Sequence, residues 1–171
     1  MMVIPQHISD TCDTLFLDRD GVVNVWLPGD YVKCWDEFRF NPGFLDFIGR
    51  YSDKFKHIFI VTNQRGVGKG VMTQAQLDDI HSRMLKAIGE AGGRIDRIYL
   101  CTSVDDSDPM RKPNPGMALQ AMKDYPDVSM ERSVMIGDQP SDHSFAQNCG
   151  MCFLQWQIGR ASCRERVCLD V

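Results

Sequence analysis

Short apolar runs alternate along the chain with longer segments in which apolar residues recur at helical spacing. The runs with the length and content of buried strands are residues 14–17, 57–61, 97–101, 133–136 and 152–155. Helical patterns fit between them at residues 42–53, 73–93, 116–123 and 141–149. Alternation of this kind is typical of parallel sheets with crossover helices. It predicts an α/β fold, a Rossmann-like three-layer sandwich around a central parallel sheet of about five strands.

The segment 21–41 breaks this alternation. It is too long for a simple turn and carries Trp26, Tyr31, Trp35 and Phe38. We expect a small hairpin or flap that lies over the end of the first strand and serves as a minimal cap. The aromatic side chains could equally do no more than fasten a loop to the core.

The composition is that of an ordinary globular protein and limits the partners of the chain. Its 171 residues, 43% hydrophobic and 25% charged, suffice for one domain with a real core. No apolar run approaches the roughly 18 residues of a membrane span, and the first residues lack the pattern of a signal peptide. We therefore expect a cytoplasmic protein without a membrane partner. The net charge of −4 argues against a nucleic-acid partner.

The seven cysteines are an odd number in a chain without an export signal, so reduced thiols are expected. Cys149 and Cys152 have the spacing of half a zinc site. The other half would have to come from Cys163 and Cys168. We disfavour a structural zinc ion on this basis.

Polar segments follow the predicted strands: DRDG after the first, TNQRG after the second, RKPNPG beyond the third and GDQPSD after the fourth. Because ligands of such sheets bind outside the carboxyl ends of the strands, we expect these segments to form one site. Asp18 and Asp20 end an apolar run and bracket an arginine. Buried carboxylates need a partner, and a metal ion is the obvious candidate.

These residues fit phosphoryl transfer, which needs an in-line nucleophile, a cation and a proton donor. Asp18 would attack phosphorus and form an aspartyl-phosphate, and Asp20 would protonate the leaving alkoxide and then activate water. Mg²⁺ fits an all-oxygen site made of Asp18, the backbone carbonyl of Asp20 and Asp138. Lys112 would neutralise the charge shared by nucleophile and phosphate, and Arg111 could add a bidentate substrate contact.

Two further features stay open or are set aside. Asp142 opens a predicted helix, where it could be a helix cap or a contact of the metal shell or of Lys112. The segment RGVGKG, residues 65–70, does not have the spacing of a P-loop. We expect its glycines to give the pocket a flexible lip.

Together, the segments FLDRDGVVN, DYVKCWDEFRFNPG, VTNQRGVGKGVMT, RKPNPGM and GDQPSDHSFAQNCGM resemble the haloacid dehalogenase (HAD) superfamily of phosphohydrolases, subfamily IIIA. They are most similar to its small-capped branch of heptose-bisphosphate and histidinol-phosphate phosphatases, over about residues 14–153. The resemblance implies that Thr62 holds the transferring phosphoryl group and that Asn63, Arg65 and Arg111 contact the substrate.

The resemblance also implies a Mg²⁺-dependent phosphatase of a small phosphorylated metabolite, acting as a monomer or weak oligomer. Heptose bisphosphate is the first expected substrate, histidinol phosphate the second and a nucleic-acid 3'-phosphate the third. A non-catalytic binding module is disfavoured because no expected carboxylate is missing. Many members of the branch carry a zinc loop, but CTSVDDSDPMRKP holds Cys101 without a histidine or second cysteine before Arg111. This departure bears on the substrate more than on the chemistry.

Residues 158–171, IGRASCRERVCLDV, show no strand alternation and little apolar content. Their central part resembles the translation of a common sequencing adaptor. We therefore expect a HAD-like phosphatase domain over residues 1–157 and a non-native tail over residues 158–171. The alternative is a natural basic tail.

Overall fold

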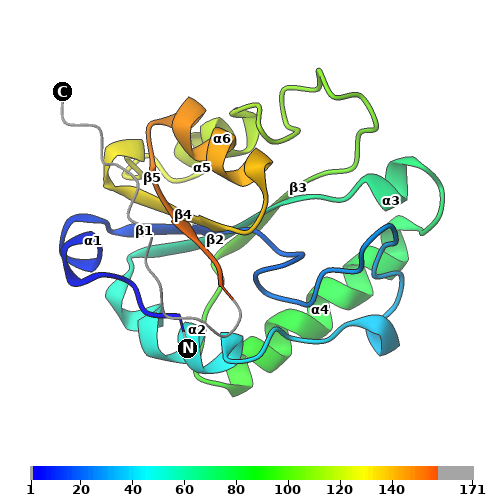
Figure 1. Ribbon diagram of the computed structural model, residues 1–171, viewed down its shortest axis with the longest axis horizontal. Helices are drawn as coiled ribbons and strands as arrows, with labels where there is room; N and C mark the ends of the chain where they lie inside the picture. Colours follow the sequence, from blue (N-terminus) through cyan, green and yellow to red (C-terminus); the bar gives the residue numbers. More distant parts are fainter. Residues whose placement is uncertain (1, 158–171) are drawn as a thin grey trace.

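The computed structural model describes residues 2–157 and arranges them as a five-stranded sheet between helices (Figure 1). The strands are β1 (Thr14–Leu17), β2 (His57–Asn63), β3 (Arg97–Cys101), β4 (Ser133–Gly137) and β5 (Cys152–Gln155). Every neighbouring pair is parallel, in the order β3-β2-β1-β4-β5. The predicted α/β sandwich with a parallel sheet is confirmed. The predicted tail lies outside the described residues.

Helices α2 (Phe44–Tyr51) and α4 (Gln74–Glu90) cover one face of the sheet, and α5 (Gly116–Asp124) and α6 (Pro140–Cys149) cover the other (Figure 1). The sequence analysis missed α1 (Gln6–Thr11), α3 (Arg65–Gly68) and the 3-10 turns η1 (Trp35–Glu37) and η3 (Met130–Arg132), and it merged most of the 3-10 turn η2 (Ser52–Lys54) with the helix expected over residues 42–53. These elements are too short to show a helical period. No helix within residues 2–157 is both long and apolar enough to cross a membrane.

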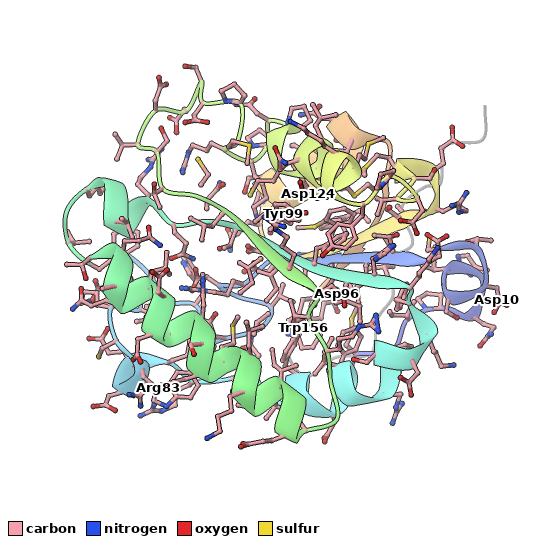
Figure 2. All side chains as sticks on the ribbon, turned by 180° about the vertical axis from the view of Figure 1, so that it is seen from behind. Asp10, Arg83, Asp96, Tyr99, Asp124 and Trp156 are labelled. Carbon is pink, nitrogen blue, oxygen red and sulfur yellow. The ribbon has the colours of Figure 1, made fainter. Side chains whose placement is uncertain are left out.

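Both faces of the sheet are buried, which explains why the strands are apolar at successive positions. In β1, Leu15 and Leu17 pack toward α2 and α4, whereas Phe16 packs toward α5. Figure 2 shows side chains filling both layers. There Tyr99 of β3 donates a hydrogen bond of 2.9 Å to Asp124 of α5, and Trp156 lies in the opposite layer.

The register brings the carboxyl ends of three strands to one edge. Leu17 of β1 pairs with Ile60 of β2 and with Ile136 of β4. Asp18 therefore leaves the sheet just beyond this level, and the segment after β4 leaves beside it. Strand β2 runs on to Asn63, two residues further than expected, because it still pairs with β3 there. This longer strand holds its terminal side chains rigidly at the edge.

The segment 21–41 lies over this edge as a long loop. It does not form the regular hairpin that was one expectation, since its pairing is reduced to isolated bridges of Asn24 with Asp20 and Phe40. Asn41 closes the base of the loop by donating to the carbonyls of Val22 and Asn24, at 3.0 and 3.1 Å. We call residues 21–41 the flap.

The aromatic residues of the flap fall into two groups, one packed against the core and one facing the space above the strand ends. Trp35 stacks on Phe38, with ring centroids 5.0 Å apart, and both rings contact Phe40 edge-on. Phe40 in turn stacks on Phe44 of α2, so this group fastens the flap to the core. Trp26 is 48% exposed and faces the space above the strand ends.

Candidate active site

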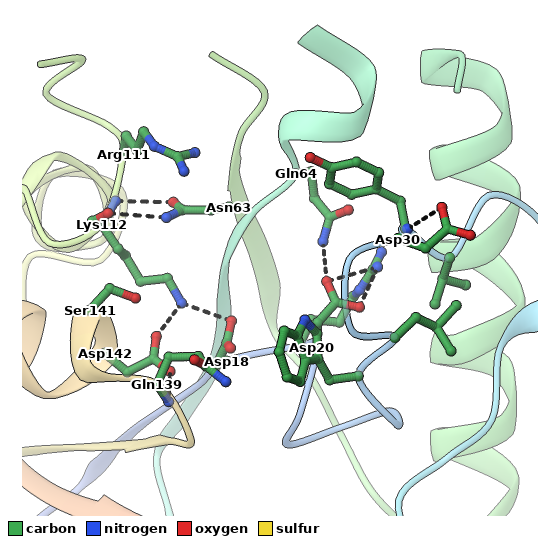
Figure 3. Close-up of a pocket in the computed structure, with 15 residues that line it drawn as sticks. Asp18, Asp20, Asp30, Asn63, Gln64, Arg111, Lys112, Gln139, Ser141 and Asp142 are labelled. Atoms are coloured by element: carbon green, nitrogen blue, oxygen red, sulfur yellow. Dashed lines mark hydrogen bonds and ion pairs between the residues drawn. The ribbon is translucent and has the colours of Figure 1, made fainter. Parts of the chain in front are cut away.

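A cavity of about 260 Å³ opens at the carboxyl edge of the sheet, beneath the flap (Figure 3). Its polar lining comes from the strand ends and the loops that follow them: Asp18, Arg19, Asp20, Asn63, Gln64, Arg111, Lys112, Gln139, Ser141 and Asp142. The flap supplies the rest of the wall, namely Trp26, Leu27, Asp30, Tyr31 and Val32. The four polar segments that follow the predicted strands therefore converge on one place, as the strand order requires.

Lys112 joins two carboxylates at the base of this cavity. Its Nζ lies 2.7 Å from Oδ1 of Asp18 and 2.6 Å from Oδ1 of Asp142, and its side chain is 2% exposed. Burial acts to lower the pKa of Lys112, but the charges of Asp18 and Asp142 outweigh it and raise that pKa. The ammonium therefore remains charged, shared between two carboxyl groups.

Asp18 directly follows β1 and is buried beside this shared cation. Burial raises the pKa of Asp18 to about 8, an effect that Lys112 opposes and Asp142 reinforces. One ammonium balances these two carboxyl groups only while one of them holds a proton, and the raised pKa places that proton on Asp18 in the metal-free chain. The site thus has room for a further positive charge.

Asp18, Asp138 and Asp142 form the acidic cluster, in which one carboxylate oxygen from each lies within 4.8 Å of the others. Burial raises the pKa of Asp138, and its Oδ1 is buried without a hydrogen-bond partner within residues 2–157. Gly21, with φ at +99°, passes so close that a Cβ there would overlap the Asp138 carboxylate. Convergent oxygens with an unpartnered buried atom fit a hard divalent cation such as Mg²⁺.

The structure answers the question left open for Asp142, which performs both of the tasks considered. Its Oδ2 accepts from the backbone N–H groups of Asp138 and Gln139, at 3.2 and 3.1 Å, within a capping box at the start of α6. Its Oδ1 accepts from Lys112. A Cβ on Gly137 would overlap the Asp142 side chain, so glycine permits this close approach.

Asp20 points away from Lys112, toward the other side of the cavity (Figure 3). It accepts two bonds from Nη2 of Arg19, at 2.8 and 3.0 Å, and further bonds from Asn24 at 2.9 Å and Gln64 at 2.8 Å. Burial acts to raise the pKa of Asp20, but the charge of Arg19 and these hydrogen bonds hold that pKa below its usual value. Asp20 is therefore an ionised carboxylate with a cation of its own.

Thr62 and Asn63 organise the wall between the two sides. The buried hydroxyl of Thr62 accepts a hydrogen bond of 2.8 Å from Nε2 of Gln64. Asn63 binds the backbone of Lys112 in both directions, accepting from its N–H at 3.0 Å and donating to its carbonyl at 3.1 Å. These two bonds fix the loop that carries Lys112 against the end of β2.

Arg65 and Arg111 meet through Asp106, although Arg65 is not among the residues that line the cavity. Nε of Arg111 lies 3.0 Å from Oδ1 of Asp106, and Nη2 of Arg65 contacts the same oxygen. Arg111 lines the cavity, and the side chain of Asp106 is 84% exposed. The segment that begins at Arg65 forms the short helix α3 rather than the expected flexible lip.

Sequence reasoning gave no task to several residues that shape the site. Gln64 and Arg19 stand inside quoted motifs, and only their contacts with Asp20 show what they do. The only sequence signal for their roles was position: Arg19 stands next to Asp20, and Gln64 follows Asn63. His81 had none, because it lies 62 residues from Arg19, on one face of α4, and contacts it only in the folded chain.

Comparison with known proteins gives the chain its family. Residues 109–162 match the HAD-hydrolase-like family. The D-glycero-α-D-manno-heptose-1,7-bisphosphate 7-phosphatase of Mycobacterium bovis is 36% identical over 153 residues, which cover 86% of this chain and 80% of that protein. The D-glycero-β-D-manno-heptose-1,7-bisphosphate 7-phosphatase of Bordetella bronchiseptica is 36% identical over 167 residues, which cover 92% of both chains.

A solved structure agrees. The crystal structure of D,D-heptose 1,7-bisphosphate phosphatase from B. bronchiseptica, complexed with magnesium and phosphate, superposes with a TM-score of 0.76. It shares 34% sequence identity, and the match covers 84% of this chain and 79% of that one. With relatives of this identity over most of its length, the chain belongs to the HAD-like hydrolase family and is a homologue of the heptose-1,7-bisphosphate 7-phosphatases.

Proposed function

We propose that this chain is a Mg²⁺-dependent phosphatase that removes the 7-phosphate of a D-glycero-D-manno-heptose 1,7-bisphosphate. The observation that carries the proposal is the buried Asp18–Lys112 pair, 2.7 Å apart, at the base of a cavity beside the acidic cluster. Relatives at 36% identity act on the α and β anomers of this sugar, so the substrate class is shared while the anomer differs among them.

Asp18 is the proposed nucleophile. Its carboxylate attacks phosphorus in line with the leaving oxygen, and the product is an aspartyl-phosphate that water later hydrolyses. Lys112, held beside the attacking oxygen, offsets the negative charge that nucleophile and phosphoryl oxygens share in the transition state. The pair is preorganised, because Asp142 and Asn63 already fix the side chain and the backbone of Lys112.

The acidic cluster is the proposed metal site. Asp18 and Asp138 would supply carboxylate ligands and Asp20 its backbone carbonyl, with Asp142 adjoining through its contacts with Asp138 and Lys112. Mg²⁺ there would supply positive charge that keeps Asp18 ionised and screens the phosphate oxygens.

Asp20 is the proposed proton donor and acceptor. In the substrate-free chain it is ionised, as its contacts with Arg19 require. A phosphate dianion placed beside it raises its affinity for a proton, which Asp20 takes from solvent before the chemical step and then gives to the leaving alkoxide. After the alcohol leaves, the ionised Asp20 is suited to take a proton from the attacking water.

The remaining residues are proposed to bind the substrate. Thr62 accepts a bond from Gln64 and can still donate its own hydroxyl proton toward a phosphoryl oxygen. Asn63 shapes the adjoining wall. Arg111 lines the cavity and shares Asp106 with Arg65, and Asp106 is so exposed that a second phosphate of the substrate can replace it at little cost.

A panel of phosphate esters tests this function. With Mg²⁺ present, we expect release of the 7-phosphate from both anomers of heptose 1,7-bisphosphate to exceed that from histidinol phosphate and from a 3'-phosphorylated oligonucleotide. The Asp18→Asn variant, measured in parallel, removes any contaminating activity from the comparison. Failure to hydrolyse every phosphate monoester of the panel would contradict the proposal, and preference for histidinol phosphate would change its substrate.

A further inference from the structure

Arg19 is the largest fully buried side chain of the described chain, and it carries a charge. Its Nη2 donates hydrogen bonds to both carboxylate oxygens of Asp20, at 2.8 and 3.0 Å. Its Nη1 lies 3.2 Å from Nε2 of His81, which is itself buried on α4. A buried guanidinium that binds a site carboxylate with one nitrogen and a histidine with another needs an explanation.

The chemistry of the contact fixes the state of His81. A guanidinium has no lone pair to offer, so Nη1 must donate and Nε2 of His81 must accept. The ring is therefore neutral and carries its proton on Nδ1. Burial and the nearby charge of Arg19 lower the pKa of His81 to about 4, which agrees with a neutral ring at ordinary pH.

His81 also limits where the guanidinium can lie. Nε of Arg19 has no hydrogen-bond partner within residues 2–157, so the polar contacts of the group are those with Asp20 and His81. Asp20 holds one end of the planar group, and His81 holds the other. Without the histidine, Nη1 would be buried without an acceptor and the group would be driven to turn toward one.

We propose that His81 is a positioning residue that acts through Arg19 to fix the carboxylate of Asp20 for proton transfer. This inference rests on the proposed function, in which Asp20 gives and takes the proton. Asn24 and Gln64 also hold Asp20, but both are neutral, so Arg19 alone among these partners supplies the balancing charge. His81 lies on α4, so the orientation of that charge depends on a helix that carries none of the motifs at the strand ends.

The expected signature is a change in leaving-group dependence. A poor leaving group, such as the alkoxide of a sugar phosphate, needs a proton from Asp20, whereas nitrophenolate departs readily without one. Loss of His81 should therefore slow hydrolysis of the sugar phosphate far more than hydrolysis of p-nitrophenyl phosphate. A merely structural loss would slow both alike.

Two variants of His81 and one control separate these cases. His81→Leu removes the acceptor, and His81→Gln keeps one as an amide oxygen. Met84→Ala perturbs the same buried face of α4 and removes no nitrogen or oxygen acceptor. We expect kcat for the sugar phosphate to fall about tenfold or more in His81→Leu, since general acid catalysis contributes about 10²–10⁴ in rate. We expect it to recover to within about threefold of wild type in His81→Gln, and the ratio of the two substrates to stay at the wild-type value in Met84→Ala.

An equal loss for both substrates in His81→Leu would overturn the proposal, as would the same change of ratio in Met84→Ala. The tautomer provides a test that needs neither a variant nor activity. Nitrogen NMR of the histidine rings in the full chain should show a proton on Nδ1 of His81 and none on Nε2 at neutral pH. A proton on Nε2 would refute the contact itself. Wild-type protein inactive on both esters would instead refute the proposed function.

Discussion

The two sides of the cavity shift the pKa values of their aspartates in opposite directions, although Asp18 and Asp20 are separated by one residue (Figure 3). On one side, a single ammonium is shared by Asp18 and Asp142, and burial raises the pKa of Asp18 to about 8. On the other side, Asp20 is the carboxylate partner of Arg19 and also accepts hydrogen bonds from the neutral side chains of Asn24 and Gln64. The pKa of Asp20 lies below its usual value.

The difference is one of charge balance. The Lys112 side gathers the three carboxylates of the acidic cluster around one ammonium, which leaves two negative charges in excess when all are ionised. The Arg19 side is neutral. A divalent cation would balance the first side and is not needed on the second. In the proposed mechanism, this difference suits Asp18 to a metal and a phosphoryl group, and Asp20 to proton transfer.

The largest expected effect comes from Asp18→Asn. An amide of the same shape cannot attack phosphorus, so turnover should fall below about one hundredth of the wild-type rate. Above about pH 8, where Asp18 of the metal-free chain is ionised, the same change removes a buried charge from an overly negative cluster, so the metal-free variant should melt there at a higher temperature than metal-free wild type. Rates by phosphate release and melting by calorimetry check both. Appreciable residual turnover would mean that another group is the nucleophile.

Loss of the shared cation should be nearly as damaging. Lys112→Met keeps most of the length of the side chain and removes its charge, so kcat should fall by about a hundredfold. The metal-free protein should lose about 3 kcal/mol of unfolding free energy, because two carboxylates are left buried without their cation. Denaturant titration measures the stability. A loss of rate below about tenfold would show that Lys112 is not part of the transition-state machinery.

Asp20→Asn tests the Arg19 side of the cavity. It should slow sugar-phosphate hydrolysis by about 10²–10⁴, in line with the loss of a general acid, and p-nitrophenyl phosphate hydrolysis much less. Its effect on metal-free stability should be the reverse of that of Asp18→Asn, because Arg19 then loses its buried anion. If both substrates were slowed equally, Asp20 would not be the proton donor.

Mg²⁺ should stabilise the chain by acting on the Lys112 side. Binding at one hundred times the dissociation constant contributes about 2.7 kcal/mol, so the melting midpoint should rise by roughly 5–10 °C. Asp138→Asn removes a ligand and should abolish most of this rise, whereas Asp20→Asn keeps the backbone carbonyl and should retain it. Calorimetry with Mg²⁺ and with EDTA makes the comparison. If both variants lost the Mg²⁺-induced rise equally, the metal would not act on the Lys112 side alone.

The smallest effect is expected from truncation after Gln157. Both sides of the cavity are built from residues before position 143. We propose that residues 158–171 are not part of the phosphatase domain, so the shortened chain should keep the activity and melting midpoint of the full chain. A clear loss of either, measured on the two proteins side by side, would show that these residues belong to the domain.

Much of this arrangement follows from local sequence patterns. The strands carry enough apolar residues to be placed within two positions, and strand order then brings Asp18, Lys112 and Asp138 to one edge. The pattern could not show that Asp142 serves Lys112 and the helix cap at once, because both tasks share one helix-start signal. Nor could it show the contact of His81 with Arg19, which depends on how α4 packs beside the first strand.

The central claim is that Asp18, and not Asp20, carries the phosphoryl group. Acid quenching of the enzyme during steady-state turnover, followed by borohydride reduction, converts an aspartyl-phosphate to homoserine, which peptide mass spectrometry can locate. We predict homoserine at position 18 with Asp20 unchanged, and none when Asp18→Asn is treated in the same way. Homoserine at position 20, or no reduced residue in enzyme trapped while turning over, would contradict the account.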